Sequence, residues 1–333
     1  MTISEIYIYP IKSLGGISLK SAALTDRGLE YDRRWMLVDQ NNRFLSQREH
    51  PKMALLQVSI GSSGILVHHK LKAGPALLIP FTHPESTDAN PGPNPAVLPH
   101  LQSTGPNPDA ITPATSGEAP LTPAASASTA AAAAAAAPTN PGANPTSPAP
   151  DQTISVTVWD DTCCARSISE EADRWFTKAL GIPCHLVYMP DATRREVDPQ
   201  YAQHHEITSF SDGYPLLVIG QASLDDLNAR LDQPLPMDRF RPNLVFTGGH
   251  PFQEDEMQEF EIADIKFFGV KPCARCVMTL IDQATGERGK EPLRTLSKYR
   301  QKNNKILFGQ NLLFQGRGRI SIGDRISVVV GQQ

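Results

Sequence analysis

Short stretches in which apolar and polar residues alternate dominate this chain, and this period of two predicts β-strands. Such stretches cover residues 3–10, 17–24, 35–39, 53–60, 65–69, 154–159, 184–189, 216–219, 244–246, 261–268, 277–281, 319–322 and 325–330. The segment Gly61–Gly64, between two of these strands, is typical of a hairpin turn. Many short strands with few helices favour a barrel or a sandwich over a doubly wound α/β fold.

Helical spacing of apolar residues appears clearly between residues 172 and 180. Ser167 and Glu170 fit a capping box before this helix, and Gly181 is expected to end it. Two shorter helices are predicted, over 224–231 with Ser223 as its cap and over 292–299. Helices are therefore expected to be a minor part of a β-rich fold.

Residues 73–152 differ sharply in composition from the rest of the chain. They contain no Lys or Arg, hold 17 of the 29 prolines and include an alanine run. Such a segment buries too few apolar side chains to offset its ordering entropy. We predict a disordered insertion, with a proline-rich docking segment as the alternative and residues 75–80 as a short ordered piece of the domain.

The charge and the cysteines exclude several classes of protein. The chain has 31 Lys and Arg against 35 Asp and Glu, so a basic surface for nucleic acid is not expected. No run of about 18 apolar residues could span a bilayer, and the N-terminus shows no targeting pattern. The five cysteines lack the spacings of a disulfide scaffold. We expect a soluble, cytoplasmic protein, with mitochondrial association left open.

The most distinctive chemistry lies in residues 271–282, KPCARCVMTLID. Cys273 and Cys276 could be zinc ligands, a redox dithiol, buried structural residues, or a thiolate ligand or nucleophile. A zinc site would need a complementary ligand pair that the sequence does not offer. A thioredoxin-like dithiol would precede a helix, whereas a strand is predicted here. Lys271 and Arg275 favour a thiolate, which suits soft metal centres.

Cationic and hydroxyl side chains also gather at predicted strand ends, as at Lys12–Ser13, Arg33–Arg34 and Arg239–Asn243. Such groups fit phosphate recognition, although arginines at strand ends are also common on surfaces. Neither a P-loop nor a dinucleotide fingerprint is present. Residues 212–215 look like a turn, and residues 308–311 like a polar site or a loop between strands.

Together these motifs resemble the MOSC family, the molybdenum cofactor sulfurase C-terminal domain, with its β-rich N-terminal partner domain. The strings that carry the resemblance are YPIKSLGG (9–16), YDRRWMLVD (31–39), FLSQREHPKMALL (44–56), VWDD (158–161), FSDGYPLLVI (210–219), ASLDDLN (222–228), RFRPNLV (239–245), KPCARCVMTLID (271–282), EPLRTLSKYR (291–300) and FGQNL (308–312). The resemblance implies an α+β, β-rich fold, with a MOSC-type β-barrel packed against a smaller β-rich domain. It places the N-terminal domain at 1–72 and 153–183 and the MOSC domain at 184–331.

Within that family the chain is similar to the amidoxime-reducing components and their bacterial relatives, which bind a Mo-molybdopterin cofactor. That similarity implies that Cys276 is the catalytic protein ligand to molybdenum and that Asp212 lies near the metal, where we expect it to carry protons. The implied cofactor-binding residues are Lys12, Ser13, Arg33, Gly213, Tyr214, Arg241, Asn243, Ala274, Arg275 and Asn311. Ala274 stands where serine is often found, so one side-chain hydrogen bond is absent.

The function implied by the resemblance is reduction of N-hydroxylated compounds to the amine or amidine plus water, a detoxification chemistry. The expected partner is a separate electron donor, either a cytochrome b5 with its NADH reductase or a flavin or iron–sulfur reductase. The alternative is a cofactor-binding or sulfur-carrier module that uses a cysteine persulfide. A β domain that only binds partners is the third possibility.

Overall fold

The computed structural model describes residues 1–81, 151–202 and 204–328, and these residues belong to one compact unit. Most of the predicted insertion lies outside the described residues. Its first part, however, contains the strand β7 (Leu77–Pro80), so the short ordered piece anticipated at 75–80 is a strand. The described chain is β-rich with few helices, and this confirms the predicted α+β, β-rich class.

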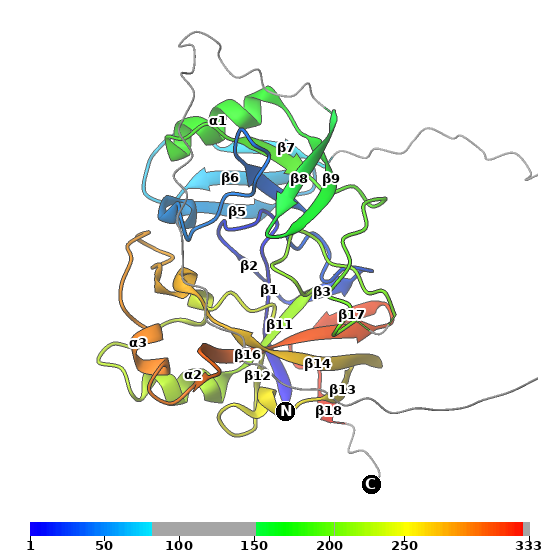
Figure 1. Cartoon of the computed structure of the whole chain (residues 1–333), viewed down its shortest axis with the longest axis vertical. Helices are drawn as coiled ribbons and strands as arrows, with labels where there is room; N and C mark the ends of the chain where they lie inside the picture. The colour runs from blue at the N-terminus through cyan, green and yellow to red at the C-terminus, as the bar shows by residue number, and fades with distance from the viewer. Residues whose placement is uncertain (82–150, 203, 329–333) are drawn as a thin grey trace, which may run out of the picture. The chain divides into compact units, whose positions relative to one another are not determined.

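A nine-stranded sheet forms the larger part of the fold (Figure 1). Its strand order is β18-β13-β14-β16-β11-β12-β1-β2, and β15 pairs with β16. Only β11 and β12 pair in parallel among these strands of the described chain; the other pairs are antiparallel. The strands are β1 (Thr2–Ile8), β2 (Ile17–Leu19), β11 (Leu216–Gly220), β12 (Leu244–Thr247), β13 (Glu259–Ile262), β14 (Ile265–Ala274), β15 (Gln301–Lys302), β16 (Lys305–Gln315) and β18 (Ile326–Val328).

Three smaller sheets complete the fold. One has the order β4-β10-β9-β8, another is β5-β6-β7, and β3 pairs with β17. Their strands are β3 (Ser21–Leu24), β4 (Trp35–Val38), β5 (Leu56–Ile60), β6 (Gly64–His69), β8 (Thr153–Val158), β9 (Asp161–Ser167), β10 (His185–Tyr188) and β17 (Gly318–Ser321). Strand β4 is buried on both faces: Trp35 and Leu37 join one apolar core, and Met36 and Val38 join another. Burial of both faces explains why this strand reads as a continuous apolar run.

The helices begin at different residues from those predicted. Helix α1 (Glu170–Leu180) is capped by Ser169, whose hydroxyl accepts a hydrogen bond from the Ala172 amide, so the predicted Ser167 cap is wrong. Ser167 instead ends β9, a strand that the sequence did not predict. Gly181 does end α1, in the left-handed conformation with φ 74°. The predicted cap, Ser167, was thus two positions before the observed one, because either serine could serve as the cap.

The other two helices are also displaced. Helix α2 (Gln221–Asn228) begins after Gly220, and Ser223 lies inside it. There the Ser223 hydroxyl donates to the Glu254 carboxylate at 2.7 Å, so it is not a cap. Helix α3 (Leu293–Leu296) is shorter than the predicted 292–299.

Several predicted strands are divided or replaced. Residues 53–60 contain the end of a 3₁₀ helix, η1 (Pro51–Leu55), before β5, and 17–24 and 261–268 each divide into two strands. The run 277–281 is a 3₁₀ helix, η4 (Val277–Leu280), because the Thr279 amide and hydroxyl both bond to the Cys276 carbonyl. Conversely, residues 308–311, interpreted as either a polar site or a loop between strands, lie within β16. The remaining 3₁₀ helices are η2 (Met237–Arg239) and η3 (Gln253–Asp255).

The sheets join parts of the chain that are far apart in sequence. β1 pairs with β12, β3 with β17, and β4 with β10. The first strands therefore belong to the same sheet as the strands after residue 216, and the division at residues 183–184 cuts across the four-stranded sheet. The proposed domain boundaries stay a prediction.

Candidate functional site

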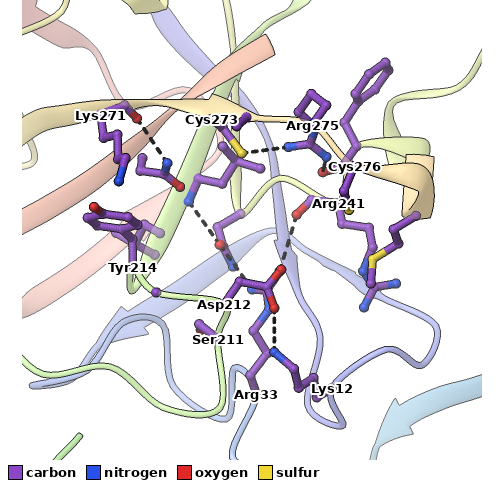
Figure 2. A pocket seen from close by; sticks show the side chains of 18 of the residues that line it. Lys12, Arg33, Ser211, Asp212, Tyr214, Arg241, Lys271, Cys273, Arg275 and Cys276 are labelled. Atoms are coloured by element: carbon purple, nitrogen blue, oxygen red, sulfur yellow. Dashed lines mark hydrogen bonds and ion pairs between the residues drawn. The ribbon is translucent and has the colours of Figure 1, made fainter. Parts of the chain in front are cut away.

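A pocket of about 310 Å³ lies where several strands of the large sheet begin or end (Figure 2). Strands β11 and β12 are parallel and both start here, while β1 is antiparallel to β12 and ends here. The end of β14 and the middle of β16 complete the wall, since Lys271 is paired with Asn311. The topology thus brings loops from both halves of the sequence to one place.

All twelve residues predicted for the site line this pocket. They are Lys12, Ser13, Arg33, Asp212, Gly213, Tyr214, Arg241, Asn243, Ala274, Arg275, Cys276 and Asn311. The structure therefore confirms that they converge, whereas their roles stay predictions. Among the described residues, six cationic side chains and one carboxylate line the pocket, so an anionic ligand is favoured there.

Cys276 lies at the start of η4 with an extended backbone. Its sulfur accepts a hydrogen bond from Nε of Arg48 at 3.2 Å. The same guanidinium donates from Nη2 to Asp212 at 2.9 Å and stacks 4.4 Å from the ring centre of Trp159. Arg48 was not among the predicted site residues, although it lies in one of the strings that carried the family resemblance.

Asp212 accepts bonds from three side chains. Lys12 donates at 2.7 Å, Arg48 at 2.9 Å and the Trp159 indole at 3.3 Å. Burial among protein atoms raises the pKa of this carboxyl, but the two cations outweigh that effect and hold its pKa well below the ordinary value. Asp212 is therefore ionised at neutral pH, and the exposure of 55% of its side chain to the pocket also favours the charged form. It can accept a proton but holds none to donate.

Lys12 is buried and bonds to the Phe210 carbonyl and to Asp212, both at 2.7 Å. Burial lowers the pKa of its ammonium to about 8, and the Asp212 carboxylate limits the decrease. The Lys12 side chain therefore loses its positive charge as the pH rises past about 8.

Arg33 and Arg241 pack against the buried ring of Tyr9. Their guanidinium carbons lie 4.6 and 4.1 Å from its centre. Arg33 pairs with buried Asp32, but Arg241 pairs with no carboxylate in the described part of the chain. Burial and the neighbouring Arg33 lower the pKa of Arg241 to about 10, although Tyr9 opposes this. A buried guanidinium without a counter-ion favours an anionic ligand.

Three of the predicted anion-binding residues have left-handed backbones. The φ angles are 66° for Ser13, 52° for Arg33 and 54° for Arg241. This conformation costs roughly 1–3 kcal/mol for a residue other than glycine and is often found at binding sites. Asn243 fixes this wall, since it accepts from Arg33 at 3.2 Å and donates to Asp32 at 3.0 Å.

Cys273 and Cys276 have different surroundings. The Cys273 sulfur accepts from Arg275 Nη1 at 3.1 Å, and the same guanidinium donates to the Phe240 carbonyl at 2.6 Å. Ala274, between them, contributes no polar side-chain atom. The two thiols therefore interact with different arginines, which divides the apparent CxxC pair into two separate sulfur sites.

Lys271 and Tyr214 lie near each other at the side of the pocket (Figure 2). The Lys271 ammonium lies 4.4 Å from the ring centre of Tyr201 and 5.8 Å from that of Tyr214. Asn311 donates to the Lys271 carbonyl at 3.1 Å and holds this part of β14. Arg48, Trp159 and Lys271 lie in strings that carried the family resemblance but were not assigned to the site. Tyr201 lies outside all of those strings.

Several polar atoms of the pocket are buried and have no hydrogen-bond partner in the described part of the chain. They are Oγ of Ser13, Oγ of Ser211, the hydroxyl of Tyr214, Nη1 of Arg48 and Nε of Arg275. Unsatisfied buried polar groups are costly, so a ligand with several acceptor oxygens would stabilise the site. These donors and the uncompensated Arg241 fit the phosphate and the polar ring system of a pterin cofactor.

The thiol of Cys276 is the soft donor that fits a metal carried by such a cofactor. In the described residues, no group of three or more His, Cys, Asp and Glu side chains could hold a metal ion. A metal bound to Cys276 would therefore take most of its ligands from the cofactor.

Comparison with known proteins identifies two domains in this chain. The family model for the MOSC N-terminal beta barrel domain matches residues 1–104, and that for the MOSC domain matches residues 205–327. In the described part of the chain, no helix is long and apolar enough to cross a membrane.

Three relatives illustrate the range of similar proteins. Mitochondrial amidoxime reducing component 2 of Rattus norvegicus is 26% identical over 98% of this chain and 82% of its own length. Mitochondrial amidoxime-reducing component 1 of Homo sapiens is also 26% identical, over 98% and 82%. Molybdenum cofactor sulfurase of Oryza sativa is 28% identical over 92% of this chain, which spans only 32% of that relative.

Proposed function

This chain is a MOSC-domain protein, distantly homologous to amidoxime reducing components and molybdenum cofactor sulfurase, and from that premise we propose that it is a molybdenum-cofactor-dependent reductase of N-hydroxylated compounds. The observation that carries the proposal is the Cys276 sulfur in a pocket lined by cations with unsatisfied donors. A bound molybdenum cofactor would supply the two-electron chemistry that breaks the nitrogen–oxygen bond.

The residues of this chain would bind and orient the cofactor. Cys276 would be the protein ligand to the metal. Lys12, Ser13, Arg33 and Arg241 would hold the phosphate, because they combine positive charge with unpaired donors. The other lining residues assigned to the cofactor are Gly213, Tyr214, Asn243, Ala274, Arg275 and Asn311.

Asp212 would serve proton transfer only from its ionised form. Its low pKa makes it a weak base, so it would hold a proton only transiently and pass it on, with Lys12 at 2.7 Å as the neighbouring donor. The two electrons of each turnover would come from a separate donor protein, either a cytochrome b5 with its NADH reductase or a flavin or iron–sulfur reductase.

The test is metal and pterin analysis of protein purified from a host that makes the cofactor. We expect about one molybdenum per chain and reduction of benzamidoxime to benzamidine with a chemical electron donor. Cys276→Ala should lose both, whereas Cys164→Ala, at an exposed cysteine outside the pocket, should lose neither. Equal molybdenum content and turnover in wild type and Cys276→Ala would refute the assignment.

A sulfur-carrier function is the second candidate, and the Cys273–Arg275 contact favours it, since a nearby guanidinium would stabilise an anionic persulfide. Cyanide-labile sulfur on purified protein that shows no reductase turnover would support this function. Its loss in Cys273→Ala but not in Cys276→Ala would identify the carrier.

A further inference from the structure

We propose that Arg48 is a positioning residue that holds the Cys276 sulfur and the Asp212 carboxylate with two arms of one guanidinium and so controls how strongly the sulfur donates to a bound metal. The reference to a metal rests on the proposed function. The contacts of Arg48 belong to the protein itself and can be tested without a metal.

Arg48 is the one side chain of the described residues that donates a hydrogen bond to the Cys276 sulfur, from Nε at 3.2 Å. Nη2 donates to Asp212 Oδ2 at 2.9 Å, while Lys12 occupies Oδ1 of the same carboxylate at 2.7 Å. A thiolate bound to a metal would repel a carboxylate in the same pocket. The Arg48 guanidinium bonds to both groups, and its positive charge offsets their repulsion.

Lysine could not perform this role. The fork of a guanidinium directs separate N–H groups along fixed directions, whereas an ammonium is a single point charge on a flexible stem. The single nitrogen atom of a lysine at position 48 could approach either the sulfur or the carboxylate, but not both with good geometry. The third nitrogen, Nη1, is buried without a partner, so it also remains available to a ligand in the pocket.

The surrounding residues hold Arg48 in place. The Trp159 ring lies 4.4 Å from its guanidinium carbon, and the indole N–H donates to Asp212 at 3.3 Å. Phe44 packs against Trp159 with ring centres 4.9 Å apart. Arg288 donates to the backbone carbonyl of Arg48 at 2.6 Å. Both the guanidinium and the backbone of Arg48 are therefore fixed before any ligand binds, as a positioning residue requires.

Trp159, which stacks on Arg48, also has an unusual backbone conformation. Trp159 has a left-handed backbone with φ 58° and remains 42% exposed at the end of the β8–β9 hairpin. A large residue rarely adopts this conformation without a reason, and such residues gather at functional sites. The two-residue turn between β8 and β9 requires such a φ angle at its first residue, and this turn places the Trp159 side chain against Arg48 and Asp212.

The expected consequence is electronic. A hydrogen bond to a metal-bound sulfur draws electron density away from the metal. This stabilises the reduced state of the metal and raises its reduction potential. Removing the Arg48 N–H group should therefore lower the reduction potential of the bound metal. A residue that only stabilised the fold would not change that potential.

The experiment compares Arg48→Met and Arg48→Lys with Arg230→Met in the purified holoprotein. Arg230 is a matched control, because it stacks 4.4 Å from Tyr299 and pairs with Asp226 at 2.8 Å, yet does not line the pocket. Redox titrations followed by the electron paramagnetic resonance of the metal measure the potential. We expect it to fall most in Arg48→Met, to fall less in Arg48→Lys, where one N–H group can still reach the sulfur, and to match wild type in Arg230→Met. We also expect KM for benzamidoxime to stay within about twofold while kcat falls.

An unchanged potential at wild-type molybdenum content would overturn the proposal. If a variant or the wild type carries no metal, the contact between Arg48 and Cys276 is tested in the metal-free proteins. They are labelled with iodoacetamide and analysed by mass spectrometry. The rate at Cys276, relative to exposed Cys164, should fall by about tenfold in Arg48→Met, since a hydrogen bond from a cation stabilises a thiolate. Equal relative rates would overturn the role of Arg48, whereas a metal-free wild type would count only against the proposed reductase.

Discussion

Replacing Glu254 by glutamine should make this protein more stable at neutral pH and remove part of its pH dependence. Glu254 is fully buried in η3, beside the first turn of α2. Its Oε2 accepts from Ser223 at 2.7 Å, while Oε1 is buried without a partner in the described part of the chain. Burial raises the pKa of this carboxyl from 4.5 to about 7, although Ser223 opposes the shift.

The sign and the size of the effect follow from these two pKa values. Because the folded pKa is the higher one, the folded state keeps a proton that the unfolded state releases. The stabilisation is thus complete below about pH 4.5 and is lost as the pH rises through about 7. The interval corresponds to ~3 kcal/mol, at ~1.4 kcal/mol per pH unit. Glutamine remains neutral, so the variant should keep this free energy, less the cost of satisfying its amide.

Urea unfolding of wild type and Glu254→Gln at pH 5 and pH 8 measures the difference. The free energy of unfolding of wild type should decrease between the two pH values by up to ~3 kcal/mol more than that of the variant. Glu256→Gln is the control, because this nearby glutamate has a side chain that is 62% exposed. The reasoning fails if Glu254→Gln and wild type lose stability in parallel.

Three further predictions concern the pocket and the core. Arg241→Met should reduce pterin content several-fold without lowering the melting temperature, because a buried guanidinium without a counter-ion is removed; a fall in the melting temperature at full pterin content would contradict this. Sulfate binding to metal-free protein, measured by calorimetry, should weaken as the pH rises past about 8, where Lys12 loses its charge, and Lys12→Arg should abolish that decline; an equal decline in both would show that Lys12 is not responsible. Gly309→Ala should cost at least ~1 kcal/mol in urea unfolding, because φ is 83° and an added Cβ would lie 2.8 Å from Ile219; unchanged stability would refute the strain.

Sequence reasoning chose residues that line one pocket, because the strings that carry the family resemblance could be read even where the predicted secondary structure was wrong. Lys271 to Asp282 identified the two thiols, and the family resemblance gathered Lys12 and Arg33 with them. Yet the apolar run after Cys276 looked like a strand and is a 3₁₀ helix, since the carbonyl of Cys276 bonds to Thr279. A local pattern of β-branched residues could not reveal a turn that local hydrogen bonds impose.

The misses share a physical cause. Arg48 is one cation in a loop, and only contacts 164 and 228 residues away in sequence distinguish it. β16 was missed because Gly309 and two polar residues interrupt its apolar pattern. Two of these residues, Gln310 and Asn311, pair with Pro272 and Lys271 of β14, so tertiary pairing makes them a strand. Long-range partners, not local preference, decide both cases.

The pairing of strands across the chain has a practical consequence for protein engineering. Lys12, Ser13, Arg33 and Arg48 precede residue 82, and every other residue that lines the pocket follows residue 150. The two segments share three sheets through β1–β12, β3–β17 and β4–β10. Two polypeptides covering 1–81 and 151–333 should therefore recognise each other when co-expressed. Such a pair would form a two-part reporter in which the pocket exists only when the fragments meet.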